Sequence, residues 1–258
     1  MVSSLLFVTT LVFQVQGSSG TGFRPTADVR QPSTVVPPEA PKNVTPEMRG
    51  DIFMARKMYR EALETYKTGP ADSAVLANKI GIAYHQMLDL EDARKYYERA
   101  VKLHPNYAEA INNLGTVYYA RKSYRRSITQ YKKALRITPE SASILSNLGT
   151  SYFARKNYDL AFATYQQALK LDPEVFEHRS TMGILLQERT VDERAKFHYY
   201  LARTYAKAGD VEHTLIYVRK ALEEGFKEPD KFKKDPEFQI VRDNPEFKLI
   251  ISAEHKVL

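Results

Sequence analysis

Three stretches of this 258-residue chain repeat one another at a fixed spacing. They read IGIAYHQMLDLEDARKYYERAVKLHP (residues 80–105), LGTVYYARKSYRRSITQYKKALRITP (residues 114–139) and LGTSYFARKNYDLAFATYQQALKLDP (residues 148–173). Glycine, tyrosine, alanine and proline recur in the same columns, 34 residues apart, as Gly81, Gly115 and Gly149 show. A fixed period of this length indicates a stacked repeat, in which each unit buries its apolar face against the next.

The residue types in these columns predict two antiparallel helices in each unit. Glycine inside a helix costs about 1 kcal/mol relative to alanine, so its recurrence indicates a close approach between helices. The tyrosines are suited to fill the gap between neighbouring helices, with the ring buried and the hydroxyl at the edge. The closing prolines, Pro105, Pro139 and Pro173, are expected to end the second helix of each unit.

These columns resemble the tetratricopeptide repeat, whose pattern is L-G-x-x-Y followed by a small residue, an aromatic residue, an alanine and a closing proline. The resemblance is specific over residues 74–173. It implies an all-α fold, a right-handed superhelical solenoid of helix-turn-helix repeats. It also implies a non-enzymatic scaffold that needs no cofactor and binds another protein or an extended peptide in its concave groove.

The period also suggests how the rest of the chain is organised. The N-terminal repeat and the repeat after the insertion are more divergent than the three consensus copies. The expected segments are a signal peptide (1–17), a disordered linker rich in Pro, Ser and Gly (18–44), a divergent N-terminal repeat (45–73), three consensus repeats (74–173), an insertion (174–194), a fourth full repeat-like unit (195–227) and a C-terminal helical cap (228–258).

The N-terminus indicates export. Residues 5–15, LLFVTTLVFQV, form an apolar run that is too short to span a bilayer comfortably, and small residues follow it. This pattern is typical of a secretory signal cleaved after Gly17, although the basic residue that usually precedes the run is missing. We therefore expect a periplasmic or extracellular protein, and a bacterial one, because the insertion and the C-terminal ending resemble those of exported bacterial tetratricopeptide proteins.

The insertion and the tail carry their own patterns. Thr190, followed by two acids, predicts the start of a long helix that runs to about residue 207, and Met182–Gln187 is apolar. The insertion is either a loop that shields the core or an arm specific for a partner. In the tail, Asp235-Pro236-Glu237-Phe238 and Asn244-Pro245-Glu246-Phe247 predict two short helices that cover the last repeat.

Composition excludes several kinds of chemistry. The chain has no cysteine, so disulfides, thiolate catalysis and cysteine-ligated zinc are ruled out. Its six histidines form no His-x-x-x-His pair, and no phosphate-binding glycine loop is present. We therefore expect no catalytic residue and no metal site. The net charge of +7 permits nucleic-acid binding, but the chain shows no nucleic-acid motif.

The family resemblance places a peptide-binding groove on the first helix of each repeat. In the asparagine-ladder members of the family, the position of Asn113 and Asn147 holds the backbone of an extended peptide, and an asparagine amide both donates and accepts. Lys79 and Tyr200 replace the other asparagines of that ladder. The implied groove positions are Asn78, Lys79, Asn112, Asn113, Thr116, Tyr119, Asn147, Thr150, Phe153, Tyr199, Tyr200 and Arg203.

A second candidate surface is basic. An Ala-Arg-Lys word recurs at one turn of several repeats and would stack into a cationic ridge formed by Arg56, Lys57, Arg121, Lys122, Arg155 and Lys156. The ridge is either a solvated edge, where helix C-termini favour cations, or a site for an acidic partner, anionic lipid or cell-wall polymer. A further alternative is an accessory subunit of an enzyme or transporter, docked through residues 174–194. The sequence leaves the oligomeric state open.

Overall fold

The computed structural model describes residues 44–177 and 190–253. The chain divides into two units, residues 1–42 and 43–258, and the described residues all belong to the second. The predicted signal peptide, all but the last residue of the predicted linker, and the apolar stretch Met182–Gln187 lie outside the described residues. The predictions made for them therefore stay predictions.

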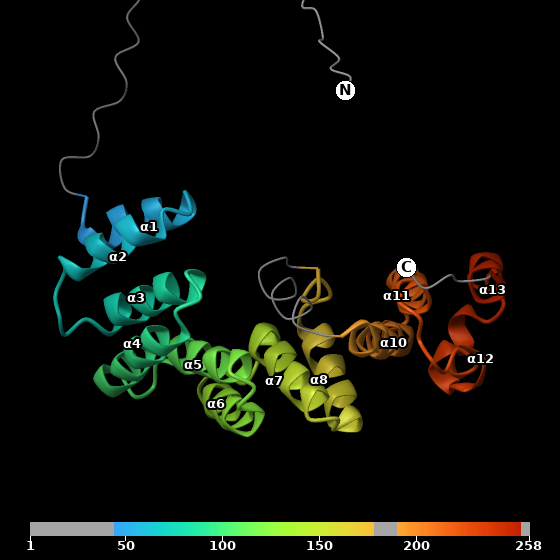
Figure 1. Ribbon diagram of the computed structural model, residues 1–258. Coiled ribbons are helices and arrows are strands. Elements are labelled where there is room, and N and C mark those ends of the chain that lie inside the picture. Colours follow the sequence, from blue (N-terminus) through green and yellow to red (C-terminus); the bar gives the residue numbers. More distant parts are fainter. Residues whose placement is uncertain (1–43, 178–189, 254–258) are drawn as a thin grey trace, which may run out of the picture. The chain divides into compact units, whose positions relative to one another are not determined.

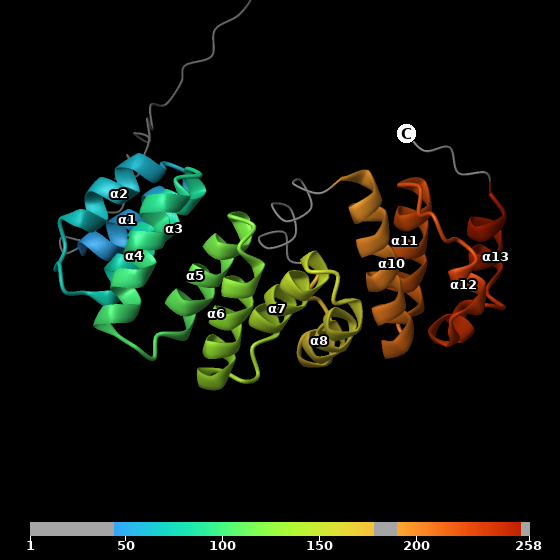
Figure 2. The same ribbon diagram turned by 60° about the horizontal axis from the view of Figure 1, so that its bottom comes forward.

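The described residues form helices and no strand, so the prediction of an all-α fold is confirmed. The helices pack as consecutive antiparallel pairs, and each pair also packs against the next one along the chain, as both views in Figures 1 and 2 show. The pairs are α1 (Pro46–Ala55) with α2 (Tyr59–Lys67), α3 (Ala74–Gln86) with α4 (Leu90–Leu103), α5 (Ala108–Ala120) with α6 (Tyr124–Ile137), α7 (Ala142–Ala154) with α8 (Tyr158–Leu171), and α10 (Val191–Ala208) with α11 (Val211–Glu223).

A glycine–tyrosine contact holds the two helices together in each of the first four pairs. A Cβ atom built on Gly115 would lie 2.6 Å from Cε1 of Tyr131, well inside van der Waals contact. Gly81 with Tyr97 and Gly149 with Tyr165 repeat this geometry. The same contact joins Gly50 of α1 to Tyr66 of α2, at 2.2 Å. The first helix pair therefore packs like the consensus repeats, although its sequence diverges.

The turn between paired helices has a recurring left-handed residue. Lys57, Leu88, Lys122 and Lys156 all have φ between 58° and 63°, a region that non-glycine residues rarely adopt. In each case the amide that follows the left-handed residue donates back to a carbonyl at the end of the first helix, as Ser123 N does to Tyr118 O at 2.8 Å. This Schellman-type closure satisfies the last carbonyls of the helix and leaves the lysine side chains exposed at the turn.

The C-terminal part begins with a well-capped helix, as the sequence predicts. Thr190 and Glu193 form a capping box at the start of α10. The last helices are α12 (Lys231–Lys234), the 3-10 helix η1 (Pro236–Val241) and α13 (Pro245–Ser252). Asn244 caps α13 as predicted. Asp235 does not cap η1 with its side chain, because its carboxylate accepts a hydrogen bond from the Tyr199 hydroxyl instead.

Candidate functional site

A chain of asparagine amides links the first helices of three successive repeats. Nδ2 of Asn113 on α5 donates to Oδ1 of Asn78 on α3, at 3.0 Å. Nδ2 of Asn147 on α7 donates to Oδ1 of Asn112 on α5, at 3.1 Å, and Asn112 reaches Asn113 at 3.4 Å. The sequence predicted these residues as contacts for a peptide, whereas in the structure they bind one another.

The asparagines differ in how much capacity they keep for a ligand. Asn78 is buried, and its Nδ2 also donates to Oε1 of Glu109, at 2.9 Å. Asn147 is buried as well, whereas Asn112 and Asn113 are partly exposed. Since an amide has two N–H donors and two acceptor lone pairs, Asn112 and Asn113 are the asparagines that retain both access and spare hydrogen-bonding capacity.

Three other predicted groove residues are engaged within the protein. Lys79 pairs with Asp51 of α1, at 2.7 Å, and with Glu47, at 3.2 Å. The hydroxyls of Thr116 and Thr150 accept hydrogen bonds from the buried Tyr131 and Tyr165 hydroxyls, at 3.1 and 3.3 Å. These side chains therefore position the helices of their own and neighbouring repeats.

The structure corrects the prediction for Tyr199 and Arg203. Tyr199 is only 2% exposed, because its ring stacks on Phe226 with centroids 4.5 Å apart. Arg203 donates to Oε1 of Glu237 in η1, at 2.8 Å, and lies over the ring of Phe162. Both residues thus lie beneath the C-terminal segment rather than along an open groove.

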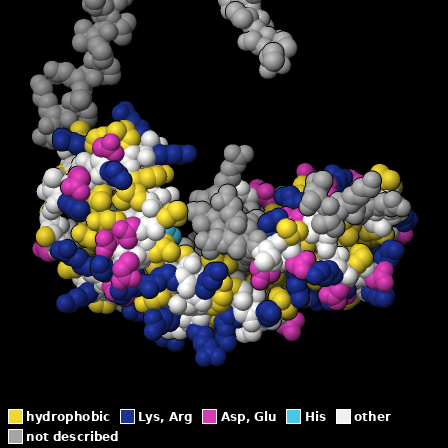
Figure 3. All heavy atoms as spheres, viewed as in Figure 1, with side chains coloured by type: hydrophobic (Ala, Val, Ile, Leu, Met, Phe, Trp, Pro, Cys, Tyr) yellow, Lys and Arg dark blue, Asp and Glu magenta, His cyan; other side chains and the backbone are white. Residues whose placement is uncertain are grey.

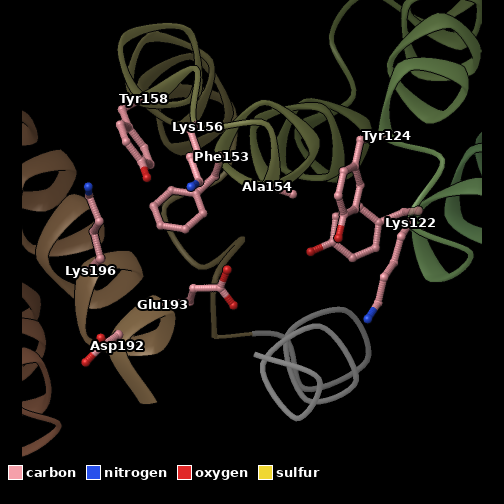
Figure 4. Close-up of a pocket in the computed structure, with 10 residues that line it drawn as sticks. Lys122, Tyr124, Phe153, Ala154, Lys156, Tyr158, Asp192, Glu193 and Lys196 are labelled. Atoms are coloured by element: carbon pink, nitrogen blue, oxygen red, sulfur yellow. The ribbon is translucent and has the colours of Figure 1, made fainter. Parts of the chain in front are cut away.

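The remaining predicted aromatic residues gather around a pocket. Its volume is about 310 Å³, and its walls come from α5, α7, the α5–α6 and α7–α8 turns and the first turns of α6, α8 and α10 (Figure 4). The lining residues are Tyr119, Lys122, Tyr124, Phe153, Ala154, Lys156, Tyr158, Asp192, Glu193 and Lys196. We refer to this site as the aromatic pocket.

One wall of the aromatic pocket is a cluster of stacked rings. Tyr158 stacks on Tyr200 with centroids 5.1 Å apart, and Phe153 meets the edge of Tyr158 at 5.2 Å. Burial raises the pKa of the Tyr200 hydroxyl to about 12, so this hydroxyl stays protonated at neutral pH. The ammonium of Lys196 lies 4.1 Å from the centroid of Tyr158, which is cation–π geometry. The wall therefore combines apolar area with positive charge.

The lysines and acids of the aromatic pocket differ in their partners. Asp192 pairs with Lys227, and Oε2 of Glu193 accepts from the Thr190 amide within the capping box. Lys122 and Lys156 are exposed and have no ion-pair partner among the described residues. Asp192 and Glu193 do not pair with Lys122 or Lys156. The ammonium groups of the two lysines are therefore placed to meet an anionic group of a ligand.

The predicted cationic ridge is interrupted. Arg56, Lys57, Arg121, Lys122, Arg155 and Lys156 are all exposed at the turns, as expected. At the corresponding positions of the α3–α4 turn, however, the chain has Met87 and Leu88, and Leu88 is 76% exposed. This break is visible in the sequence, where QML stands in the column that holds ARK elsewhere.

Comparison with known families agrees with this architecture. Family models described as "TPR repeat" match residues 81–122 and 115–154, and the model described as "Tetratricopeptide repeat" matches residues 142–175. Residues 81–175 of the chain are therefore tetratricopeptide repeats. These repeats support a role as a protein-interaction scaffold, because tetratricopeptide repeats bind proteins or peptides. Within the part of the chain that the structure describes, no helix combines the length and apolar content needed to cross a membrane.

Several solved structures resemble the chain only distantly. The "Crystal structure of MamA" is 19% identical, with 68% of this chain and 93% of that chain covered and a TM-score of 0.48. "MamA 41-end from Desulfovibrio magneticus RS-1" is 20% identical, with 68% and 90% covered and a TM-score of 0.48. At these values the similarity adds no argument about function. No curated protein sequence matches the chain.

Proposed function

We propose that this protein is a binding scaffold without enzymatic activity, and that it holds an extended segment of a partner protein at the aromatic pocket. An apolar or aromatic side chain of that segment would pack on the ring cluster. An acidic side chain beside it would meet Lys122 and Lys156. The observation that carries the proposal is that both lysines and the rings of Phe153 and Tyr158 line one pocket. In Figure 4 Lys156 lies beside these rings, and Lys122 lies across the pocket from them.

The proposal follows from how such pockets bind. Peptide ligands gain most of their affinity from a few large side chains in desolvated pockets, while charged groups set specificity and association rate. Tyr158 and Phe153 supply the apolar wall, and the exposed ammonium groups of Lys122 and Lys156 supply the charge. On α5, the partly exposed Asn112 and Asn113 are placed to bind the backbone of the same segment.

The test compares two charge-reversed variants in living cells. A tagged copy that carries Lys122→Glu and Lys156→Glu is crosslinked to its partners, which are identified by mass spectrometry. The matched control carries Arg56→Glu and Lys57→Glu, at the equivalent turn of the first helix pair, so that the change in net charge is the same. Partners lost only from the pocket variant would support the proposal. Partners retained by both variants would contradict it.

We also propose that the protein acts outside the cytoplasm, on the support of the apolar run at residues 5–15 and the small residues after it. Cell fractionation followed by N-terminal sequencing of the purified protein tests this. A periplasmic or secreted protein that begins at Ser18 is expected, whereas an intact cytoplasmic chain would contradict export.

The alternative function is that of an accessory subunit, docked to an enzyme or transporter through residues 174–194. If a variant that lacks residues 182–187 still captured its partner, this alternative would be contradicted.

A further inference from the structure

The charge of the chain is concentrated in one repeat. Between Glu109 and Glu140 the sequence has no aspartate or glutamate. In the same interval it has Arg121, Lys122, Arg125, Arg126, Lys132, Lys133 and Arg136. The positive excess of this single repeat equals the net charge of +7 of the entire chain. Such local concentration points to a surface with a function of its own.

Five of these cations lie on one face of α6. Arg125, Arg126, Lys132, Lys133 and Arg136 are all exposed, and we call them the α6 cationic face. The opposite side of α6 is buried through Ser127, Ile128, Tyr131 and Ala134, so the cations necessarily point away from the core. In Figure 3, dark blue side chains gather along the lower edge, where Figure 1 places α6.

These cations are not neutralised within the protein. The guanidinium of Arg126 lies over the ring of Tyr118, and the ammonium of Lys132 lies over the ring of Tyr152. Arg125, Lys133 and Arg136 have no acidic partner among residues 44–177 and 190–253. Arg94 on α4 differs in this respect, because it pairs with Glu91 and Glu98.

The N-terminal end of the α6 cationic face opens into a basic hollow. Lys122, Arg125, Arg126 and Arg155 line it together with the hydroxyl side chains of Ser123 and Tyr124, and its volume is about 500 Å³. No acidic residue lines this hollow. Four cations and two hydroxyls around one concavity are the groups that bind carboxylate or phosphate oxygens.

The first turn of α6 is also unusual for this chain. The second helices of the other described pairs each have an acid in their first turn, for example Asp159 in α8 and Glu212 in α11. The first turn of α6 has no acid, and Ser123 forms no capping hydrogen bond with its side chain. Two arginines beside the positive end of a helix dipole are unfavourable on their own. An external anion would relieve this repulsion.

We propose that the α6 cationic face binds an acidic segment of a partner protein. From Arg125 to Arg136 the face extends about 16 Å along the helix axis, at 1.5 Å per residue. An extended chain covers that distance with about five residues. The segment that fits therefore has at least three aspartates or glutamates within about six residues. The hollow at the end of this surface shares Lys122 and Tyr124 with the aromatic pocket. The proposal rests instead on Arg125, Lys133 and Arg136, which do not line that pocket, so it does not depend on the one made for the pocket.

Two features that this surface lacks favour an acidic protein segment as its ligand over a membrane or a nucleic acid. No large hydrophobic side chain is exposed between Leu103 and Leu160, so the described surface offers nothing to insert into a bilayer. No tyrosine or phenylalanine in that interval is exposed for stacking on nucleic-acid bases, since Tyr118 is half-buried and covered by Arg126. Tetratricopeptide repeats moreover bind proteins or peptides.

The test is a direct titration of the full-length protein. Fluorescein-labelled hexaglutamate is the probe, and its polarisation is followed at low and at moderate salt concentration. We expect binding by the wild-type protein that weakens several-fold as salt rises. We expect binding at least tenfold weaker for the variant Arg125→Glu/Lys133→Glu/Arg136→Glu. Labelled hexaglutamine should not bind to either protein.

Matched variants separate this site from general basicity. Arg56→Glu/Lys57→Glu/Arg60→Glu changes the net charge equally at exposed residues of the first helix pair and should bind hexaglutamate like the wild type. Equal loss in both variants, or no binding by the wild type, would overturn the proposal. Tight binding of oligothymidine or of phosphatidylserine vesicles through the same residues, with hexaglutamate unbound, would overturn it in favour of another class of partner. Circular dichroism checks folding, and glutamine replaces glutamate if a reversed variant unfolds.

Discussion

At the residue scale, the repeat depends on glycines that leave room for tyrosine rings. Each ring is buried, and Gly115 with Tyr131 is representative of the contacts. The Tyr131 hydroxyl also donates to Thr116, the residue after the glycine, so one side chain fixes both the spacing and the register of α5 and α6. The glycine is therefore kept despite its cost in helix propensity, because any side chain would displace a buried ring.

The substitution Gly115→Ala tests this contact. The new Cβ would lie 2.6 Å from Cε1 of Tyr131, and overpacking a core costs about 1–3 kcal/mol. The gain in helix propensity offsets about 1 kcal/mol. We expect a net loss of up to about 2 kcal/mol in the free energy of unfolding, measured by chemical denaturation. In the double variant with Tyr131→Leu, the loss should be smaller than the sum of the two single losses, and simple additivity would contradict the explanation.

The asparagine chain leads to a second prediction. Asn78→Ala removes a buried amide that serves Asn113 and Glu109, and leaving such partners unsatisfied costs about 1–3 kcal/mol. We expect a loss of unfolding free energy in this range by denaturant titration. Asn106→Ala, at an exposed position in the loop between α4 and α5, is the control and should change stability by less than about 0.5 kcal/mol. Equal effects would mean that the chain of amides has no structural role.

These contacts show what the sequence could and could not predict about single residues. The glycine and tyrosine columns recur at one period, so their packing could be inferred. The hydrogen bonds between Asn78, Asn113, Asn112 and Asn147 could not, because they join adjacent repeats and depend on the rotation between them. The sequence pointed to these residues on the first helices as contacts for a ligand, and it did not reveal that their amides also bind one another.

At the scale of elements, the contact between α10 and α11 contains a buried titratable pair. Nδ1 of His198 lies 2.8 Å from Oε2 of Glu224, and Arg194 and Lys220 are the nearby cations. Burial lowers the pKa of His198, although Glu224 opposes the shift. Burial also lowers the pKa of His85 at the end of α3. Both histidines are therefore neutral in the folded protein at pH values where the unfolded chain begins to bind protons.

The expected consequence is a loss of stability on mild acidification. The unfolded histidines titrate near pH 6.5, and the folded ones at lower pH. Since the unfolded state then binds more protons, the free energy of unfolding should fall as pH decreases from about 6.5. Denaturant titrations at pH 7.5 and 5.5 measure this. Arg203 holds the pKa of Glu237 low despite burial, so that group responds only at more acidic pH.

The control for this pH dependence is the double variant His85→Gln/His198→Gln. It removes both titrating side chains while keeping polar groups at the two positions. We expect a smaller difference in unfolding free energy between pH 7.5 and 5.5 than in the wild type. An unchanged pH dependence would show that other groups are responsible.

The C-terminal elements explain where inference from the repeat pattern ended. Family geometry placed Tyr199 and Arg203 on a groove because they fall in the right columns of α10. The covering segment has no counterpart in the repeat, so its contacts, through Phe226 and Glu237, could not be read from the period. The DPEF and NPEF words did indicate short covering helices, and the buried Phe238 and Phe247 agree with that prediction.

At the scale of the whole described unit, stability is distributed along the array. The principal contacts join each helix to the next one in the chain, as in other solenoids, whose stability is approximately a sum of repeat and interface terms. One large cluster of buried apolar side chains extends from Ile111 to Ile250. The buried apolar side chains of α1–α4 belong to smaller clusters, two of which also include residues of α5. The N-terminal pair is therefore expected to open more easily than the centre.

Equivalent substitutions at the end and in the middle of the array test this directly. Tyr66 and Tyr131 occupy the same column, and both are buried against a glycine, so replacement by alanine costs about 3–5 kcal/mol locally. Tyr66→Ala should raise hydrogen exchange in α1 and α2 and leave α5–α8 protected, because that pair packs mainly on α3. Tyr131→Ala should raise exchange from α3 to α8, since α6 packs on both sides. Mass spectrometry of the exchanged peptides distinguishes the two patterns. If hydrogen exchange rose equally in all helices of both variants, the array would instead unfold as a single cooperative unit.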